Sequence, residues 1–295
     1  MMDLRPWAIV ALVGAVGGAP NVAPVAVSLS HVPVAVSDLD AATRDFVSLG
    51  FATKEGRPHE DGIRNRHVKF TDGTEIELIT APAATDELTR YYRRLLVQGD
   101  GAAFLSLYPN PVEVAAARLR AAGLPARLSG AVVDFPYAHP LGYIFLAPLN
   151  QSPSDRPEHF AHRNSASRLT SVTLESASFE QERRVFDALG LPEEPCPAHL
   201  APHLSGTAAA KDAVAVTCVP LADGSWLRLL QSPSRARTRI TGLGVQVGSL
   251  STLAGVLTES YVAFVQLDKP IPLVAVDGNL THGVRLEFSS GGPHQ

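Results

Sequence analysis

The feature that most constrains this chain is an internal repeat, in which one strand–helix–strand unit returns about every 70 residues. In the first copy an apolar strand at 29–36 leads into a helix that ends at Gly50. Three further copies begin with the strands 102–108, 169–175 and 242–247. A repeat of this kind predicts a set of similar modules, each stabilised by packing against another.

The helix boundaries repeat together with the strands. Ser37 has an acidic residue three positions later, and Ser178 has Gln181 at the same distance, which is the capping-box signature. In the second copy Asn110 precedes a proline, as expected at a helix start. Glycines suited to a helix C-terminus close the first three helices at Gly50, Gly123 and Gly190.

The ends of the units also match. Asp72-Gly73 opens an alternating strand that runs to Ile79, and Asp223-Gly224 opens another that runs to Leu230. The segments 140–146 and 282–288 fill the same place in the second and fourth units. Each unit therefore contains a strand, a helix and then several strands.

Several segments of the chain carry a family resemblance. They are His31-Val32-Pro33-Val34-Ala35-Val36, Leu49-Gly50-Phe51, His59 with Gly62 and Asn65, Glu75-Ile76-Glu77-Leu78-Ile79, and Pro157-Glu158-His159-Phe160. With this pattern the chain resembles the glyoxalase-like branch of the vicinal oxygen chelate superfamily, from about residue 29 onward. The resemblance implies an α+β fold of four βαβββ modules, which pair into two half-open barrels of curved sheet.

On this basis we expect modules one and two at 29–150, a linker at 151–168 and modules three and four at 169–291. Residues 1–28 contain a basic residue, a short apolar run and small residues, which is the pattern of a secretory signal; a disordered start is the alternative. The sequence thus favours a secreted or periplasmic location over a cytoplasmic one. The apolar run is too short to span a bilayer, and no other segment could do so.

The net charge of −4, with no run of Lys or Arg, argues against nucleic acid as a partner. The two cysteines, Cys196 and Cys218, lack the spacing of a zinc site. We expect them to be unpaired thiols rather than a disulfide. Four modules in one chain can complete both barrels, so we expect a monomer or a homodimer.

The resemblance implies that metal ligands come from the first and fourth strands of the modules. The first-strand positions are His31, Phe104, Ser171 (or Val172) and Leu243. The fourth-strand positions are Glu77, Leu146, Arg228 and Glu287. An imidazole and two carboxylates are suitable ligands for a divalent ion, and the chain has them in modules one and four alone.

The metal site depends on how the modules pair. If module one pairs with module four, His31, Glu77 and Glu287 form a three-ligand site. If neighbours pair, both barrels are incomplete, and His139 or His162 is the nearest candidate for a further ligand. The alternative to metal binding is a structural histidine at His31 with both glutamates in solvent.

The polar segment 57–67 is expected to line the mouth of the first cup. We assign proton transfer to His59 and substrate contacts to Asn65, Phe104 and His139. The alternative for the segment is a charged surface loop.

The predicted function is a lyase or isomerase that uses a divalent metal ion (Zn, Ni, Mn or Fe) and acts on a small, oxygen-chelating substrate. An iron dioxygenase is disfavoured, because it would be expected to show two histidines in these positions. One alternative is a metal-free protein that binds small, antibiotic-like molecules, as resistance proteins of the superfamily do. Another is that modules three and four only form a scaffold.

Overall fold

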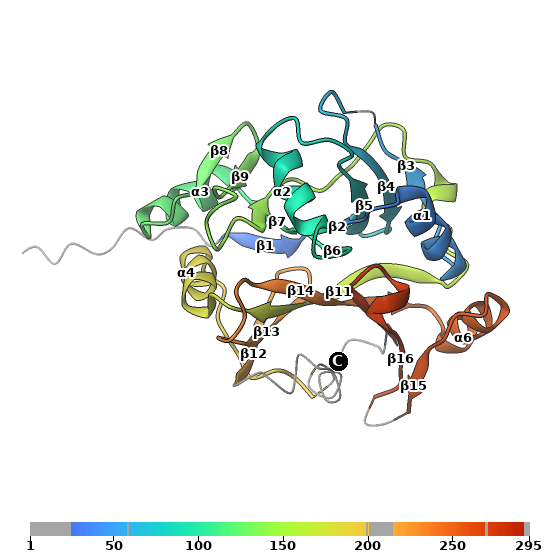
Figure 1. Ribbon diagram of the computed structural model, residues 1–295. Helices are drawn as coiled ribbons and strands as arrows, with labels where there is room; N and C mark the ends of the chain where they lie inside the picture. The colour runs from blue at the N-terminus through green and yellow to red at the C-terminus, as the bar shows by residue number, and fades with distance from the viewer. Residues whose placement is uncertain (1–24, 58, 199, 201–214, 269–270, 292–295) are drawn as a thin grey trace, which may run out of the picture.

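The computed structural model describes residues 25–57, 59–198, 200, 215–268 and 271–291. Within these residues the expected α+β fold is present, with four modules in strongly curved, unclosed sheets (Figure 1). Residues 1–24 of the candidate signal segment lie outside the described residues. The first module begins earlier than the sequence predicted, because residues 26–29 already form a strand.

The first module begins with an interrupted strand, since Ser30 separates β1 from β2. Its first helix is capped by the side chain of Asp38, which accepts a hydrogen bond from the backbone N–H of Ala41, and not by Ser37 as expected. Gly50 ends this helix with φ +89°, a left-handed conformation that glycine adopts readily. The elements are β1 (Ala26–Leu29), β2 (His31–Ala35), α1 (Leu39–Ser48), β3 (Lys54–Glu55), β4 (Arg64–Lys69) and β5 (Glu75–Thr80).

An additional helix, α2 (Glu87–Leu96), precedes the second module and begins with a capping box between Asp86 and Thr89. Tyr92 and Leu95 from this helix are buried in a small apolar cluster with Ile79. The second module comprises β6 (Gly101–Ala102), β7 (Leu105–Asn110), α3 (Val112–Ala121), β8 (Arg127–Ser129), β9 (Val132–Asp134) and β10 (Ile144–Leu146).

The third and fourth modules follow a connecting segment that contains the 3₁₀ helix η1 (Pro157–Phe160). The third comprises β11 (Ala166–Ser176), α4 (Phe179–Leu189), β12 (Ala215–Pro220) and β13 (Trp226–Gln231). The fourth comprises β14 (Arg239–Val247), α6 (Leu250–Glu259), β15 (Val265–Leu267), β16 (Leu273–Val276), η3 (Gly278–Leu280) and β17 (Arg285–Ser290). Because β11 begins at Ala166, the linker is shorter than the predicted 151–168.

Neighbouring modules pair. The first strands of modules one and two run antiparallel, with β1 beside β7 and β2 beside β6. The first strands of modules three and four, β11 and β14, also run antiparallel. A single residue pair, Ile240 with Ala102, joins the strands of the second half to β6, β2, β5, β4 and β3, while β1, β7, β10, β9 and β8 form a separate sheet. The pairing of module one with module four, which the predicted three-ligand site required, is therefore wrong.

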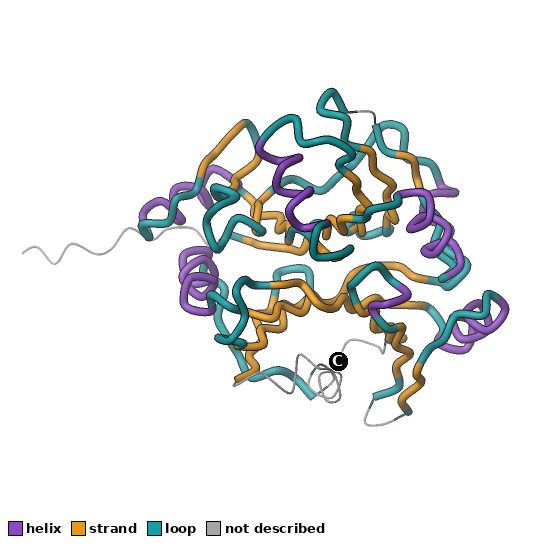
Figure 2. The backbone as a smooth tube through the Cα atoms, viewed as in Figure 1, coloured by secondary structure: helices purple, strands orange, loops and turns teal. Residues whose placement is uncertain are grey.

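Each pair of modules forms a cup, and we call the cup of modules one and two the first cup and that of modules three and four the second cup. The cups are back to back and open in opposite directions, with α1, α3, α4 and α6 at their sides (Figures 1 and 2). One apolar core fills the space between the two backs, with Val32 and Leu78 from the first sheet and Val172 and Leu243 from the second. The inner face of the first cup combines the polar side chains of β3, β4 and β5 with the small apolar cluster that contains Ile79 and Phe104.

The two cysteines form a disulfide, which corrects the expectation of unpaired thiols. A backbone bridge between Glu194 and Cys218 brings the segment after α4 beside β12, and the Cα atoms of Cys196 and Cys218 are 4.9 Å apart. Spacing along the chain could not reveal this approach. Among the described residues, no helix has the length and apolar character needed to span a membrane.

Candidate metal centre in the first cup

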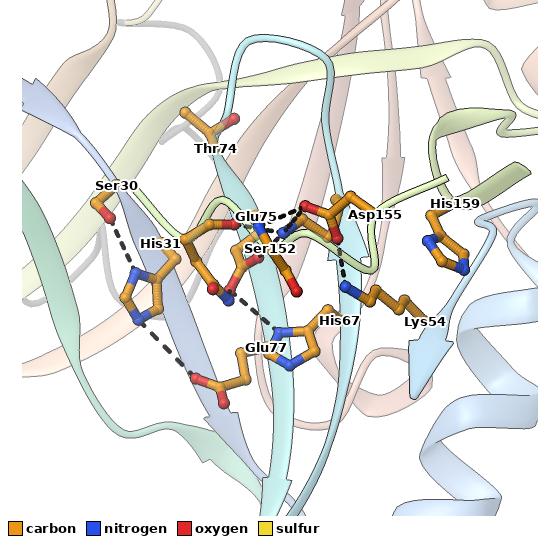
Figure 3. A network of polar contacts seen from close by, with 12 residues as sticks. Ser30, His31, Lys54, His67, Thr74, Glu75, Glu77, Ser152, Asp155 and His159 are labelled. Atoms are coloured by element: carbon orange, nitrogen blue, oxygen red, sulfur yellow. Dashed lines mark hydrogen bonds and ion pairs between the residues drawn. The ribbon is translucent and has the colours of Figure 1, made fainter. Parts of the chain in front are cut away.

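Two strands of the first module place three ligand-type side chains on the inner face of the first cup. β2 and β5 run parallel, with His31 opposite Glu75 and Pro33 opposite Glu77. Glu75 and Glu77 share a face because side chains alternate along a strand. His31 Nε2 lies 3.9 Å from Glu77 Oε2, and both side chains are close to nine-tenths buried (Figure 3).

One potential ligand atom from each of His31, Glu75 and Glu77 lies within 4.8 Å of the other two. Ligands at roughly 2.1 Å from a common ion are about 3.4 Å apart, so small side-chain movements would bring the three onto one ion. The sequence prediction missed Glu75. Its signal was the spacing of two residues from Glu77 within one strand, which places both carboxylates in the same cup.

Neighbouring polar groups orient two of these side chains. Ser30 Oγ lies 2.9 Å from His31 Nδ1, which leaves Nε2 directed toward Glu77. Asn65 Nδ2 donates a 2.5 Å hydrogen bond to Glu77 Oε1. Metal-binding histidines and carboxylates commonly have such supporting hydrogen bonds, because these fix the tautomer and the side-chain direction.

Glu75 is almost completely buried, and one of its oxygen atoms lacks a partner. Oε1 lies 2.9 Å from the donating Nδ2 of Asn150 and 3.2 Å from His67 Nδ1. Oε2 has no hydrogen-bond partner among the described residues. Burial raises the pKa of Glu75, but the hydrogen bond from His67 and the charges of His31 and His67 outweigh it, so the pKa lies below its ordinary value. A buried, ionised oxygen without a hydrogen bond fits the position of a metal ligand.

Two buried lysines lie beside this cluster. Lys69 Nζ is 3.7 Å from Glu75 Oε2 and 2.8 Å from Asp155 Oδ2, while Lys54 donates to the other oxygen of Asp155. Burial lowers the pKa of His67, but its hydrogen bond and attraction to Glu75 outweigh burial and raise it. The inner face thus carries carboxylates on β5 and cationic groups on β3 and β4.

A cavity of about 260 Å³ opens next to these residues. Its walls include His31, Glu77 and Lys54, and the segment 150–154 closes one side. This segment follows β10 and belongs to the connection between the two halves, so the predicted linker is part of the site. Apart from Gly56 and Pro153, all the residues that line the cavity have polar side chains.

The second module contributes aromatic rings. The ring of Phe145 lies edge-on to His31 with centroids 5.2 Å apart, and Phe104 lies 5.8 Å from Phe145. In the register of β7 and β10, Phe145 holds the position that Glu77 holds in module one. The expected fourth-strand residue, Leu146, is therefore corrected to Phe145, because a shift of one residue turns a side chain to the other face.

The remaining predicted site residues are placed as follows. His59 lines the cavity near its mouth and is exposed. Asn65 is buried and holds Glu77, and Phe104 is buried against the rings of Tyr91 and Tyr92 from α2.

Two predicted histidines lie away from the cavity. His139 Nδ1 accepts a hydrogen bond from the backbone N–H of Leu141, and the residue does not line the cavity. His162 accepts from the backbone N–H of Ala52 and lies 3.0 Å from the carbonyl oxygen of Lys69, so it holds the connecting segment in place.

Glu287 lies in the second cup, which corrects its prediction as a third ligand. It accepts a 2.7 Å hydrogen bond from Arg228, which occupies the fourth-strand position of module three. Neighbour pairing separates this ion pair from His31 and Glu77. The β14–β17 register also corrects the first-strand position of module four from Leu243 to Gly242, while Ser171 holds that of module three.

Comparison with known proteins agrees with this architecture. The sequence profile of a family described as "Glyoxalase-like domain" matches residues 29–190, more than half of the chain. No curated protein sequence matches the chain.

Several solved structures share the fold at low sequence identity. A mutant of 4-hydroxymandelate synthase from Streptomyces coelicolor aligns with 14% identity and a TM-score of 0.63, covering 91% of this chain and 94% of that one. A hypothetical protein from Staphylococcus aureus aligns with 12% identity and a TM-score of 0.57, covering 90% and 99%. A xylose isomerase-like TIM barrel/4-hydroxyphenylpyruvate dioxygenase fusion protein aligns with 10% identity and a TM-score of 0.59, covering 91% of this chain and 49% of that one.

Proposed function

The chain belongs to the glyoxalase-like domain family of the vicinal oxygen chelate superfamily, and from this premise we propose that it is a metal-dependent lyase or isomerase. Its substrate is a small molecule that chelates a divalent ion through two oxygen atoms. His31, Glu75 and Glu77 would hold the ion. The observation that carries this proposal is the convergence of these three side chains, with one buried oxygen of Glu75 that accepts no hydrogen bond from the described residues.

Each ligand has a defined function in this arrangement. Ser30 holds His31 through Nδ1, so that Nε2 is available to the ion. Asn65 fixes Glu77, and Asn150 and His67 fix Glu75 through its other oxygen. One imidazole and two carboxylates suit Zn, Ni, Mn or Fe.

A bound ion would act as a Lewis acid on charge that develops at the chelating oxygens of the substrate. His59, an exposed residue that lines the cavity, would move a proton between substrate and solvent. The Phe145 ring packs edge-on against the imidazole of His31 and covers that side of it. We favour lyase or isomerase chemistry over oxygenation, since the first- and fourth-strand positions of the first cup contain one histidine. The relatives named for a synthase and a dioxygenase are at most 14% identical and inform the fold alone.

The first test is the metal content of the full chain, purified without chelator and measured by elemental analysis. We expect close to one ion per chain in the wild type and its loss in His31→Ala, Glu75→Gln and Glu77→Gln. Glu180→Gln, which changes an exposed carboxylate on α4, is the control and should keep its metal. A wild-type protein that contains no metal and shows no thermal shift with added divalent ions would contradict the proposal.

A metal-free binding protein is the second candidate. The aromatic contact of Phe145 and Phe104 in module two supports it, because two apolar residues stand where a fully ligating module would carry ligands. If the metal test fails, ligand-induced stabilisation becomes the measurement. A small molecule at 100 times its dissociation constant would add about 2.7 kcal/mol to the free energy of unfolding.

A further inference from the structure

Lys54 lies on the same inner face as the candidate metal ligands, at the outer edge of the sheet. The strand registers place Lys54 opposite His67, His67 opposite Glu77 and Glu77 opposite Pro33. Residues directly opposite one another point to the same face. Lys54 is two strand spacings from Glu77, about 10 Å between backbones, and Figure 3 shows it across His67 from His31 and Glu77.

The ammonium group of Lys54 has N–H donors that make no hydrogen bond to the described residues. The residue is only 9% exposed and lines the cavity. Among the described residues Asp155 is its one hydrogen-bond acceptor. Since an ammonium group carries three N–H donors, two remain for a group inside the cavity. Burying unused charged donors is costly, which favours a ligand at this position.

The charges around the cavity also leave the positive charge of Lys54 without a full counter-charge. Asp155 supplies one negative charge, which Lys54 shares with Lys69. Glu75 and Glu77 together would balance a divalent ion. With the ion in place, one positive charge at the outer wall has no counterpart among these groups, so a ligand that reaches this wall should bring a negative charge.

We propose that the substrate carries an anionic group, a carboxylate or a phosphate, which binds Lys54 while its chelating oxygens face His31, Glu75 and Glu77. This proposal rests on the proposed function and adds the substrate class. Lys54 is then the residue that selects anionic over neutral substrates. The polar lining and the volume of about 260 Å³ limit the substrate to a small molecule.

Three hydroxamates with related chelating groups test the proposal. All three chelate through the same two hydroxamate oxygens: acetohydroxamate has no anionic tail, succinate monohydroxamate adds a carboxylate tail, and phosphonoacetohydroxamate adds a phosphonate. Their dissociation constants would be measured by isothermal titration calorimetry with the full chain loaded with Zn²⁺. We expect one of the tailed compounds to bind at least about tenfold more tightly than acetohydroxamate, since hydrogen bonds to charged groups are the stronger ones.

Variants assign that gain to one residue. Lys54→Met should abolish the gain and leave acetohydroxamate binding unchanged, whereas Lys54→Arg should retain most of it. Arg66→Met is the control: Arg66 is the register partner of Glu55 and points to the opposite face from Lys54. It should keep the full gain. Unchanged acetohydroxamate affinity in Lys54→Met also shows that the variant is folded.

The outcomes separate the two proposals. If acetohydroxamate binds but neither tail improves affinity more than about threefold, or if the gain survives in Lys54→Met, the assignment of an anionic substrate to Lys54 is overturned and the metal site stands. If the chain does not retain Zn²⁺, the proposed function fails, and the anionic substrate fails with it. The tail that gives the larger increase in affinity over acetohydroxamate indicates whether the substrate carries a carboxylate or a phosphate.

Discussion

Arg228 on β13 donates a 2.7 Å hydrogen bond to Glu287 on β17, and this buried ion pair occupies the fourth-strand positions of the second cup. The equivalent positions of the first cup hold Glu77 and Phe145. The same repeated framework thus presents a candidate metal ligand in one cup and a neutralised charge pair in the other.

Glu287→Gln should destabilise the chain by about 3–5 kcal/mol, because it leaves Arg228 buried without a charged partner. Arg228→Met should cost less, since Glu287 keeps its contact with Arg285. The double variant Arg228→Met/Glu287→Gln should be more stable than Glu287→Gln alone. Free energies of unfolding from urea titrations measure all three, and strictly additive losses would contradict the coupling.

Stability should depend on pH through His282, which joins the fourth module to the first half. Its Nδ1 lies 2.8 Å from Asp100 Oδ2 and its Nε2 lies 3.1 Å from Asp45 Oδ2. Only the protonated ring can donate from both nitrogens. The hydrogen bond with Asp100 raises the pKa of His282 above its ordinary value of 6.5.

Because the folded pKa is raised, this stabilisation is fully present below the ordinary pKa and is lost as the pH rises through the folded value. The wild type should therefore lose more stability than His282→Asn between about pH 6 and pH 9, as measured by urea titrations. Asparagine suits this position, since the φ of His282 is +56°. Parallel pH profiles of the free energy of unfolding for the two proteins would show that protonation of His282 does not stabilise the fold.

Reduction of the Cys196–Cys218 disulfide should lower the free energy of unfolding by roughly 2–4 kcal/mol. The bond closes a loop with a sequence separation of 22, and opening it increases the entropy of the unfolded chain. The variant Cys196→Ser/Cys218→Ser should show the same loss without reductant. Metal affinity should not change, because the disulfide joins the segment after α4 to β12, both in the second half; a change in affinity would contradict the separation of the two cups.

Removal of a supporting hydrogen bond should weaken metal binding without removing a ligand. Asn65→Ala frees Glu77 to adopt other orientations, so the dissociation constant for Zn²⁺ should rise about 10- to 100-fold in a competition with a chromogenic chelator. Asn279→Ala, an exposed amide in η3, is the control and should have no effect. An unchanged affinity in Asn65→Ala would mean that Glu77 is held by other groups.

Local signals in the sequence predicted the modules and part of the site. The alternation of apolar residues, the turns at Asp72-Gly73 and Asp223-Gly224, and the helix-ending glycines all act over a few residues, so they can be recognised without the fold. The positions of His31 and Glu77 follow from this repeat. Glu75 follows from the same alternation, and its spacing from Glu77 was sufficient to predict it.

Tertiary structure decided the rest. Phe145 replaces Leu146 and Gly242 replaces Leu243 in the inward positions, since the register of paired strands determines which of two adjacent residues faces the cup. The separation of Glu287 from His31 depends on which modules pair, and the approach of Asp155 to Lys54 depends on the path of the connecting segment. Both arise from packing between residues far apart in the chain. The modules have similar local sequences, so their partners are determined only when the apolar backs of the two cups are buried together.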